Sequence, residues 1–563
     1  MGNRKTFLAM ILSLLVSGIC YSDIKIGVVN GSDKIRPETK IAFEDFPEIR
    51  LFSAKSEYES FQIVLENTCD EDFDFKFTIS DLFLDAGNII KNSNIKAYSV
   101  EYIDVARFSR DTGKWPDPLI EVTGSRLHLD RKSRFVLWFN VFVPEYTEEG
   151  TYKGNLAIEI GGKRFKNIEI ELNVWNFCLP RTPTLRTAFA LWPGFIAKRY
   201  KLSLDSEALK DMVETYWKNM FEHRVSNLNY VCPSIEEVRG NAEMDFADFD
   251  EKMEYYVRNG INSFNVFWSG IPYTYGEQKP SEIPADFAKY LFVKQVLQGT
   301  EQHLKDKRWL SKGYIYLADE PDVKYFSVLK KTLSEINKLA PEIKRLVTIG
   351  YATSKPDNKN NYGYMDLSGY VDVWVVHTDK INQQFLEERR QEGDEVWWYV
   401  TCGTRRPYAN FWAIDYTAAE NRILFWQMFK NGAQGTLYWC INYWEKDVWK
   451  DPVSYADCNG EGSLVYWGAD GPVNSVRWEI IRDGIEDYDY LFILAEKIAE
   501  LKKGDTGGEY SDLISEAVKL CDVSDLVPSL TEYTRNYLLL LNRREEIGNM
   551  ISKITCILKE KGN

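Results

Sequence analysis

The sequence contains few residues that could bind a metal ion or carry a histidine-based proton relay. Only four of its 563 residues are histidines, and no two of them lie close together in the chain. The nine cysteines include no Cys-x-x-Cys pair and no spacing typical of metal ligands. Zinc chemistry and a Ser/His/Asp triad therefore have weak support, and we expect no metal and no cofactor. We expect the cysteines to be small buried side chains, with one disulfide at most.

The chain also lacks an excess of positive charge. It has 69 Lys and Arg against 84 Asp and Glu, which gives a net charge of −15. Nucleic acids and anionic membranes are bound through Lys and Arg that neutralise phosphates, so neither is an expected partner. With 44% hydrophobic residues, the chain can bury more than one core. A neutral or small substrate fits this composition, which leaves the oligomeric state open.

Long hydrophobic runs are absent beyond the first residues. The run from Phe7 to Val16 follows basic residues and precedes small ones, which is the order of a signal peptide. This run is too short to span a bilayer and no other is longer, so no transmembrane span is expected. We predict a signal peptide over residues 1–22 and a periplasmic or extracellular protein. Lipid attachment at Cys20 is an alternative to simple cleavage.

Residues 23–180 consist of short segments in which apolar and polar residues alternate. Examples are YESFQIVLEN, SRFVLWFNVFVPE and TYKGNLAIEI, separated by turn signals such as Gly161-Gly162. Alternation with a period of two predicts half-buried strands, and many such strands in succession predict an antiparallel β-sandwich. The two prolines of LPRTPTL, residues 179–185, predict a linker after it.

From residue 181 to 503, apolar strand-like segments alternate with helical patterns. Near-continuous apolar strands favour a parallel sheet covered on both faces. Eight of them, alternating with helices, predict a (β/α)8 TIM barrel as the catalytic domain. The predicted strands begin at Arg186, Ser226, Ser263, Gly313, Arg345, Val371, Glu395 and Gly435. Residues 504–563 have a helical pattern and are expected to form a C-terminal helical appendage.

The active site of such a barrel lies at the carboxyl ends of its strands. The residues predicted there are rich in aromatic and hydrogen-bonding groups and poor in cations. This suits a sugar, because its C–H faces pack on rings while its hydroxyls need polar partners. The substrate-binding candidates are Asn229, Trp268, His377, Arg405, Trp439, Asn442 and Trp444.

The fourth predicted strand, in YIYLADEPDV, ends in two adjacent carboxylates, Asp319 and Glu320. Asp319 is also a candidate N-cap for the helix that follows, but capping accounts for only one of the two acids. Neighbouring residues of an extended strand point to opposite faces. The pair is therefore poorly placed to flank one sugar as the two carboxylates of a retaining glycosidase do, about 5 to 5.5 Å apart.

The seventh predicted strand, VWWYVTCG, carries no acid that could serve as the missing nucleophile. A 2-acetamido sugar can supply its own nucleophile, the amide oxygen. One of the two adjacent carboxylates would then orient the acetamido group, the other would protonate the leaving oxygen, and Tyr399 would donate to the amide oxygen. The alternatives are a conventional nucleophile, Asp379 or Glu445, or a non-catalytic carbohydrate-binding protein on a barrel scaffold.

Several longer motifs resemble one enzyme family. YLADEPD, EVWWYVTCGTRRPYANF, GTLYWCINYW and GEGSLVYWG, with SAKSEYESFQIVL, TGKWPDPLI and VPEYTEEGTYKGNL, are similar to glycoside hydrolase family 123 and the wider domain group of unknown function around it. The resemblance implies a β-sandwich before a (β/α)8 domain, and an exo-acting β-N-acetylgalactosaminidase. It also implies that Asp319 stabilises the acetamido group and that Glu320 is the general acid/base. The substrate would be a glycan, glycolipid or glycoprotein that ends in a 2-acetamido sugar.

One further motif of this resemblance, SVRWEIIRDGIEDYDYL, is rich in charge. It contains Arg477, Arg482, Asp483 and Asp487 within a helical pattern. We interpret these residues as a structural ion-pair network on the last barrel helix rather than as a catalytic group.

Overall fold

The computed structural model describes residues 23–562, with gaps at 32, 45–46, 86, 125, 230, 267–273, 276–277, 280–281, 284–285, 355–361 and 506. The predicted signal peptide, Cys20 and Trp268 lie outside the described residues. Signal cleavage, lipid attachment at Cys20 and sugar binding by Trp268 therefore stay predictions. Within these ranges, no helix is both long and apolar enough to cross a bilayer. The described cysteines are all free thiols, and several are not buried as expected: Cys178 and Cys556 are exposed.

The N-terminal region forms two sheets that share one hydrophobic core. The first sheet runs β1 (Ile24–Asn30), β3 (Glu57–Asn67), β10 (Ser133–Val143), β7 (Ile95–Val105) and β8 (Gly113–Glu121). The second runs β2 (Glu48–Lys55), β12 (Lys163–Cys178), β11 (Gly150–Ile160), β4 (Phe73–Ile79) and β9 (Leu127–Leu129). Inward residues of both sheets, such as Ile63 and Leu172, join one buried cluster. The pairs are antiparallel except β2 with β12, which is parallel.

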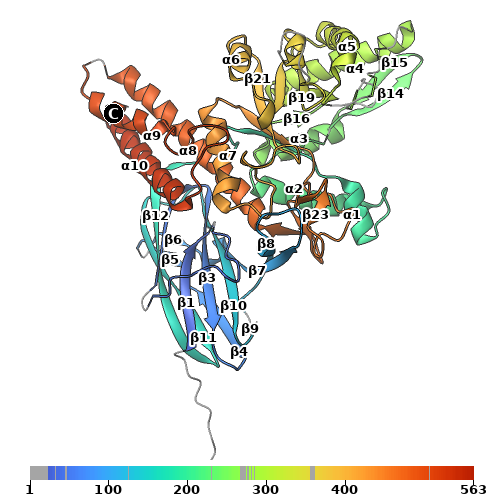
Figure 1. Ribbon diagram of the computed structural model, residues 1–563. Coiled ribbons are helices and arrows are strands. Elements are labelled where there is room, and N and C mark those ends of the chain that lie inside the picture. The colour runs from blue at the N-terminus through green and yellow to red at the C-terminus, as the bar shows by residue number, and fades with distance from the viewer. Residues whose placement is uncertain are drawn as a thin grey trace, which may run out of the picture.

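The second region contains a nearly closed parallel barrel (Figure 1). Its sheet has the order β13 (Arg186–Phe189), β22 (Gly435–Tyr438), β21 (Glu395–Tyr399), β20 (Val373–His377), β19 (Lys344–Ile349), β18 (Gly313–Asp319) and β16 (Phe264–Asn265), with the short β17 (Thr274–Tyr275) beside β18. The strand predicted at Ser226 is reduced to a single bridge between Phe189 and Asn227. A complete eight-stranded barrel therefore stays a prediction.

Polar side chains explain the irregular second strand. The backbone N–H of Ser226 donates to the Thr187 hydroxyl at 2.7 Å, and the N–H of Asn262 donates to the Ser226 hydroxyl at 3.1 Å. The Thr187 N–H in turn donates to the Asn262 side chain at 3.2 Å. Side chains that bond the backbone in this way compete with a regular strand ladder.

Helices cover the outside of the barrel. They are α1 (Pro193–Tyr200), α2 (Glu207–Glu222), α3 (Ala247–Arg258), α4 (Phe287–Asp306), α5 (Phe326–Leu339), α6 (Gln383–Gln391), α7 (Ala418–Lys430) and α8 (Val476–Gly504). A hairpin, β14 (Ser234–Val238) with β15 (Asn241–Asp245), precedes α3. Between β19 and β20 the described residues form a 3-10 turn, η5 (Gly363–Leu367), where the alternation of a (β/α)8 barrel would place a helix.

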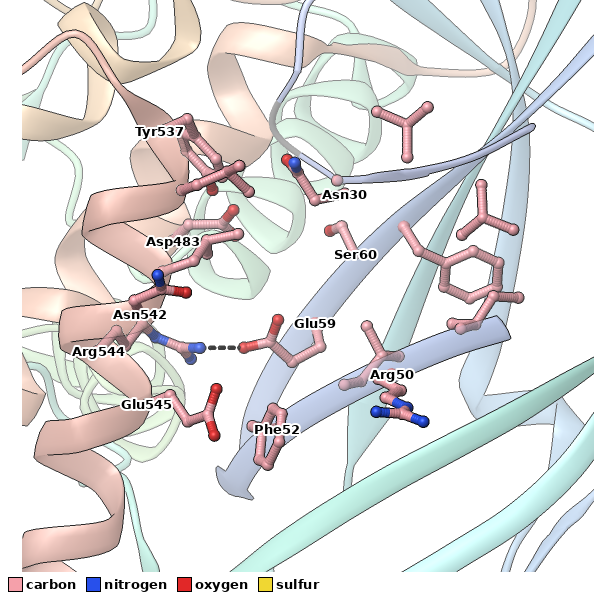
Figure 2. A pocket seen from close by; sticks show the side chains of 18 of the residues that line it. Asn30, Arg50, Phe52, Glu59, Ser60, Asp483, Tyr537, Asn542, Arg544 and Glu545 are labelled. Carbon is pink, nitrogen blue, oxygen red and sulfur yellow. Dashed lines mark ion pairs between the residues drawn. The ribbon is translucent and has the colours of Figure 1, made fainter. Parts of the chain in front are cut away.

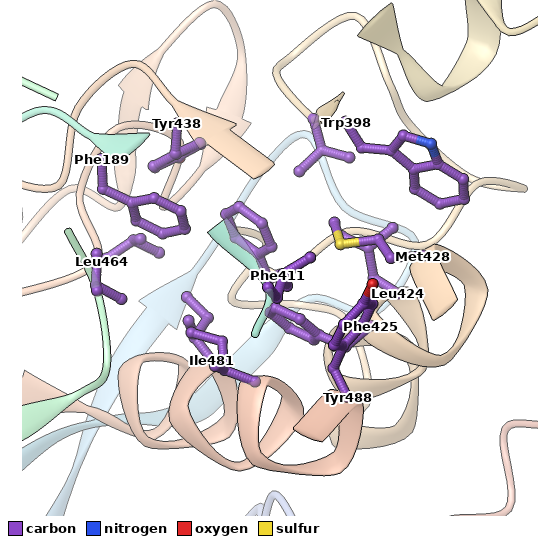
Figure 3. Packing of buried hydrophobic residues seen from close by; sticks show 14 of the residues in the cluster. Phe189, Trp398, Phe411, Leu424, Phe425, Met428, Tyr438, Leu464, Ile481 and Tyr488 are labelled. Atoms are coloured by element: carbon purple, nitrogen blue, oxygen red, sulfur yellow. The ribbon is translucent and has the colours of Figure 1, made fainter. Parts of the chain in front are cut away.

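The barrel strands and the last two barrel helices pack through aromatic rings (Figure 3). Phe411 stacks on Phe189 of β13 with 5.5 Å between ring centroids, and it meets Tyr438 of β22 edge-on at 5.1 Å. On the other side, a Cβ at Gly484 of α8 would lie 2.1 Å from the ring of Phe425 on α7. The glycine therefore allows α7 and α8 to approach closely beneath the strands.

The two regions are joined more tightly than a linker at 179–185 predicts. After β22 the chain forms β25 (Tyr466–Trp467) and β26 (Pro472–Ser475), and β26 pairs antiparallel with β8 of the first sandwich sheet. The C-terminal helices α9 (Ser511–Cys521) and α10 (Tyr537–Gly562) follow α8, and α10 runs beside the sandwich (Figure 1). Trp175 of β12 donates to Asn549 of α10 at 2.9 Å.

A fully buried arginine secures this junction. Arg477, the second residue of α8, binds both carboxylate oxygens of Asp117 on β8 at 2.9 and 2.7 Å. Its remaining N–H groups donate to the carbonyls of Trp412, Gly460 and Ser463. Both ion-pair partners are inaccessible to solvent. The guanidinium is thus satisfied on every side, as a buried charge requires.

The predicted ion-pair network on α8 is confirmed. Arg482 pairs with Glu479 at 2.6 Å, and Arg422 of α7 pairs with Asp487 at 2.5 Å. All four side chains are buried. The network links α8 to α7, which supports its structural interpretation.

We predict that Asp117→Ala destabilises the protein strongly. The substitution leaves the Arg477 charge buried without its partner, which costs about 3 to 5 kcal/mol. The free energy of unfolding, measured by urea titration, gives the change. As the matched control, Asp447→Ala removes the exposed ion pair with Lys450 and should change the free energy of unfolding by less than about 1 kcal/mol. Equal effects of the two substitutions would contradict the role given to Arg477.

Candidate active site

One threonine holds both carboxylates at the end of the fourth predicted barrel strand. Asp319 is the last residue of β18, and its Oδ1 accepts hydrogen bonds from the hydroxyls of Tyr316 and Thr348, each at 2.7 Å. The same Thr348 oxygen accepts the backbone N–H of Glu320 at 2.8 Å. Because Thr348 lies on β19, which pairs with β18, a single hydroxyl fixes both acids to the barrel.

The environment of Asp319 disfavours its charge and yet supplies donors for it. Burial raises the pKa of Asp319 above its ordinary value, and the nearby charge of Glu320 acts in the same direction. The hydrogen bonds from Thr348 and Tyr316 oppose this shift by stabilising the carboxylate. A buried carboxyl with a perturbed pKa at a strand end is typical of a functional site.

The backbone at Glu320 explains how adjacent acids can serve one site. Glu320 has a φ of 47°, in the left-handed region that costs a non-glycine residue roughly 1 to 2 kcal/mol. Its N–H bond to Thr348 helps to hold this conformation. Since β18 ends at Asp319, strand alternation does not govern the direction of Glu320. The sequence-based objection that the pair must face opposite sides therefore does not apply.

The Glu320 side chain lies between Gly350 and His377. A Cβ at Gly350, directly after β19, would lie 1.9 Å from Oε2 of Glu320, so any other residue there would displace this carboxylate from its observed position. On the other side, Nε2 of His377 lies 2.9 Å from Oε1 of Glu320. This distance is that of an ion pair, although the ring nitrogen is not aligned for a hydrogen bond.

Tyr399 completes this group from β21. Its side chain is buried, and the ring of His377 meets it edge-on with 4.7 Å between centroids. Burial raises the pKa of Tyr399 well above its ordinary value, and the charges of Asp319, Glu320 and Glu461 raise it further. The phenol is thus protonated at neutral pH and can donate a hydrogen bond.

Aromatic side chains gather beside these groups, after β13 and β22. Trp439 is half-buried, and its ring lies 5.0 Å from those of Tyr443 and Tyr455 between centroids. Trp192, which is 46% exposed, meets Trp439 edge-on at 6.5 Å. These rings offer the rigid apolar area on which a sugar face can pack.

Three other predicted binding residues already have protein partners. Asn442 is fully buried, and its amide group accepts the N–H of Trp192 at 2.9 Å and donates to the Trp192 carbonyl at 3.1 Å. Trp444 is fully buried, and its indole N–H donates to a backbone carbonyl at 3.0 Å. Asn229 accepts a backbone N–H at 2.8 Å. The contacts of Asn442 and Asn229 position the segment after β13. A role in binding stays a prediction for all three residues.

The remaining candidates lie in loops after the strands. Arg405 is exposed and donates to the backbone carbonyls of Cys402 and Ala456. The two alternative nucleophiles are both paired with lysines: Asp379 with Lys380 at 2.9 Å, and Glu445 with Lys198 at 3.2 Å. The side chain of Glu445 is 51% exposed. The sequence contains nothing that favours Asp379 over Glu445, or the reverse, as the nucleophile.

Four residues of the site were not identified from the sequence: Tyr316, Thr348, Gly350 and Glu461. Thr348 is a polar residue within the apolar strand RLVTIGYA. A hydroxyl in such a strand could have indicated a role in the site. Glu461 stands between two glycines in GEGSLVYWG, which is a sign of a tightly constrained loop. Tyr316 and Gly350 gave no comparable signal, because their roles depend on contacts between β18 and β19.

Two other features lie apart from this group. A cavity of about 690 Å³ is lined by residues of β1, β2, β3, α7, α8 and α10 and the segments next to them, and Arg544 pairs with Glu59 across it (Figure 2). The described side chains able to share a metal ion are Asp72, His128 and Asp130 in the sandwich, and all three are exposed. Exposed acidic groups of this kind are common on protein surfaces, so the trio indicates no metal centre.

Comparison with solved structures gives a match along nearly the whole chain. A family 123 glycoside hydrolase from Clostridium perfringens, described for its glycolipid glycan hydrolysis, has a TM-score of 0.67 at 15% identity and covers 95% of this chain and 99% of its own. At that identity the likeness shows a common fold.

Two more distant structures are also glycoside hydrolases. A family 39 enzyme from Bacteroides cellulosilyticus WH2 has 12% identity, a TM-score of 0.35 and coverage of 78% of this chain and 82% of its own. A GH5 xyloglucanase from Bacteroides ovatus has 10% identity, a TM-score of 0.28 and coverage of 79% and 99%. Both TM-scores are too low to indicate a shared overall fold. A comparison with curated proteins found no match.

The match to a protein family is the decisive one. The model described as "Glycoside hydrolase 123, catalytic domain" matches residues 208–494, which is more than half of the chain. The match spans the carboxylate pair, Tyr399 and the loop of Glu461. The chain therefore belongs to glycoside hydrolase family 123, and it is a glycosidase with a carbohydrate substrate.

Proposed function

We propose that this glycosidase is an exported, exo-acting β-N-acetylhexosaminidase that prefers a terminal β-N-acetylgalactosamine and uses the substrate's acetamido group as its nucleophile. The observation that carries the proposal is the Thr348 hydroxyl, which holds Asp319 and Glu320 in one site but in different surroundings. Asp319 is buried among donors, whereas Glu320 lies between Gly350 and His377. Two acids with different environments suit two different tasks.

In the first step, the acetamido oxygen attacks the anomeric carbon while the bond to the leaving oxygen breaks. Both described hydrogen bonds to Asp319 reach Oδ1, so Oδ2 is placed to accept the amide N–H of the substrate. The carboxylate also stabilises the positive charge that develops on the oxazolinium intermediate. Glu320 gives its proton to the leaving oxygen.

In the second step, a water molecule attacks the anomeric carbon and the oxazolinium ring opens, which restores the acetamido group. Glu320, now a carboxylate, takes the proton from this water. His377 lies 2.9 Å from the Glu320 carboxyl group and helps to hold it in place. Tyr399, kept neutral by burial, donates to the acetamido oxygen. Two displacements at one carbon retain its configuration.

The choice of sugar rests on the family resemblance and on the aromatic rings around Trp439. The Clostridium perfringens structure was described for glycolipid glycan hydrolysis, and we propose a similar class of glycan for this chain. The rival with a conventional nucleophile needs Asp379 or Glu445 to reach the anomeric carbon. Both acids are held by lysines in the structure, and Glu445 is largely exposed.

A panel of aryl β-glycosides tests the proposed function. We expect turnover of the 2-acetamido galactoside, weaker turnover of the 2-acetamido glucoside, and none of the plain β-galactoside and β-glucoside, because these last two lack the internal nucleophile. Release of the aryl group gives the rates, and NMR of the first-formed sugar should show the β anomer. Robust cleavage of the plain β-galactoside would overturn the proposal.

The two carboxylates should be separable by the leaving group of the substrate. Asp319→Asn should lower kcat about 100-fold to 1,000-fold with every leaving group, because it removes charge stabilisation at the intermediate. Glu320→Gln should lower kcat about 100-fold to 10,000-fold with a poor leaving group and much less with an activated phenol, which needs no proton. Glu445→Gln is the control and should retain activity. A loss in Glu320→Gln that does not depend on the leaving group would contradict its role as the acid.

A further inference from the structure

A buried glutamate, Glu461, accepts a hydrogen bond from Trp439, one of the aromatic side chains beside the carboxylate pair. Glu461 lies in the loop after β24 (Cys458–Asn459), and its side chain is 0% exposed. Its Oε1 accepts the indole N–H of Trp439 at 2.5 Å, whereas Oε2 meets no aligned donor among the described residues, although the backbone N–H of Cys402 lies close enough to lower the pKa of the carboxyl group. Leaving a buried polar atom unpaired costs roughly 1 to 3 kcal/mol. Such a feature in a native protein calls for a functional explanation.

The loop holds Glu461 rigidly against Trp439. Gly460 and Gly462, on either side of it, have φ values of 93° and 72°, which favour glycine. A Cβ at Gly462 would lie 2.5 Å from the Trp439 ring. Arg477 donates to the Gly460 carbonyl at 3.1 Å. The glutamate therefore belongs to a fixed support for the tryptophan.

Glu461 shares the electrostatic environment of the carboxylate pair. The pKa of Tyr399 responds to the charges of Asp319, Glu320 and Glu461 together, and all three raise it. The pKa of Cys402 is likewise raised by the charges of both Glu461 and Glu320. Glu461 thus lies close enough to add its charge to the site, although it does not face the solvent.

Burial disfavours the charged form of Glu461. It raises the pKa of this carboxyl group to about 8, against the opposing effects of the Trp439 N–H, the charges of Arg477 and Arg405, and the backbone N–H of Cys402. The hydrogen bond from Trp439 thus stabilises a buried carboxyl group that has few other partners.

We propose that Glu461 is a positioning residue that orients Trp439 against the terminal sugar. The proposal rests on the proposed function, in which Trp439 packs on that sugar. The carboxyl group of Glu461 accepts the indole N–H and so fixes the direction of the ring. Without this acceptor the ring loses its anchor, and the sugar binds more weakly.

Kinetics of two variants test this inference. Glu461→Leu removes the acceptor for the Trp439 N–H and should raise KM about threefold to tenfold, the worth of one buried hydrogen bond, with little change in kcat. Glu461→Gln keeps an acceptor, so its KM should stay near that of the wild type. Asp457→Asn, an exposed acid just before β24, is the control and should follow the wild type.

A second readout does not depend on turnover. In protein labelled with 5-fluorotryptophan, the Trp439 resonance is identified by its loss in Trp439→Phe. It should shift in Glu461→Leu, which lacks the acceptor, and stay near its wild-type position in Glu461→Gln. An unchanged Trp439 resonance or an unchanged KM in Glu461→Leu would overturn the inference. A wild type that fails to cleave 2-acetamido glycosides, while the resonance shifts in Glu461→Leu, would instead refute the proposed function.

Discussion

The contact between Arg477 and Asp117 is the interaction on which the two halves of the molecule depend. Asp117 belongs to the sandwich and Arg477 to the last barrel helix, and both are shielded from solvent. The same guanidinium holds the carbonyls of Gly460 and Ser463, which flank Glu461. Through these contacts the sandwich, α8 and the loop behind Trp439 form one rigid unit. The sandwich is thus part of the support of the active site.

A second constraint acts at the centre of the barrel. One hydroxyl, that of Thr348, donates to Asp319 and accepts from the backbone of Glu320. It fixes the distance between two acids that repel each other, and it holds the left-handed backbone at Glu320. Gly350 then gives the Glu320 side chain its space. Because β18 ends at Asp319, the two acids point into different surroundings although they are adjacent in the sequence.

Much of this arrangement could be predicted from the sequence, because it depends on local patterns. Apolar runs indicated seven of the barrel strands, and the end of β18 placed Asp319 and Glu320. The strand at Ser226 was overestimated, because the hydroxyls of Ser226 and Thr187 and the amide side chain of Asn262 bind backbone N–H groups there instead. Thr348, Gly350 and Glu461 escaped prediction, because their roles arise from contacts between different strands and loops. The pairing of β26 with β8 escaped it for the same reason.

The central claim is that the substrate's own acetamido oxygen is the nucleophile. The most direct measurement is the rate of cleavage of aryl 2-acetamido-β-galactosides whose acetyl methyl group carries successive fluorine atoms. Fluorine withdraws electrons from the amide oxygen while changing the size of the sugar little. The account predicts that kcat falls steeply with each fluorine added. A kcat that stays constant along the series would contradict it and would point to a nucleophile supplied by the protein.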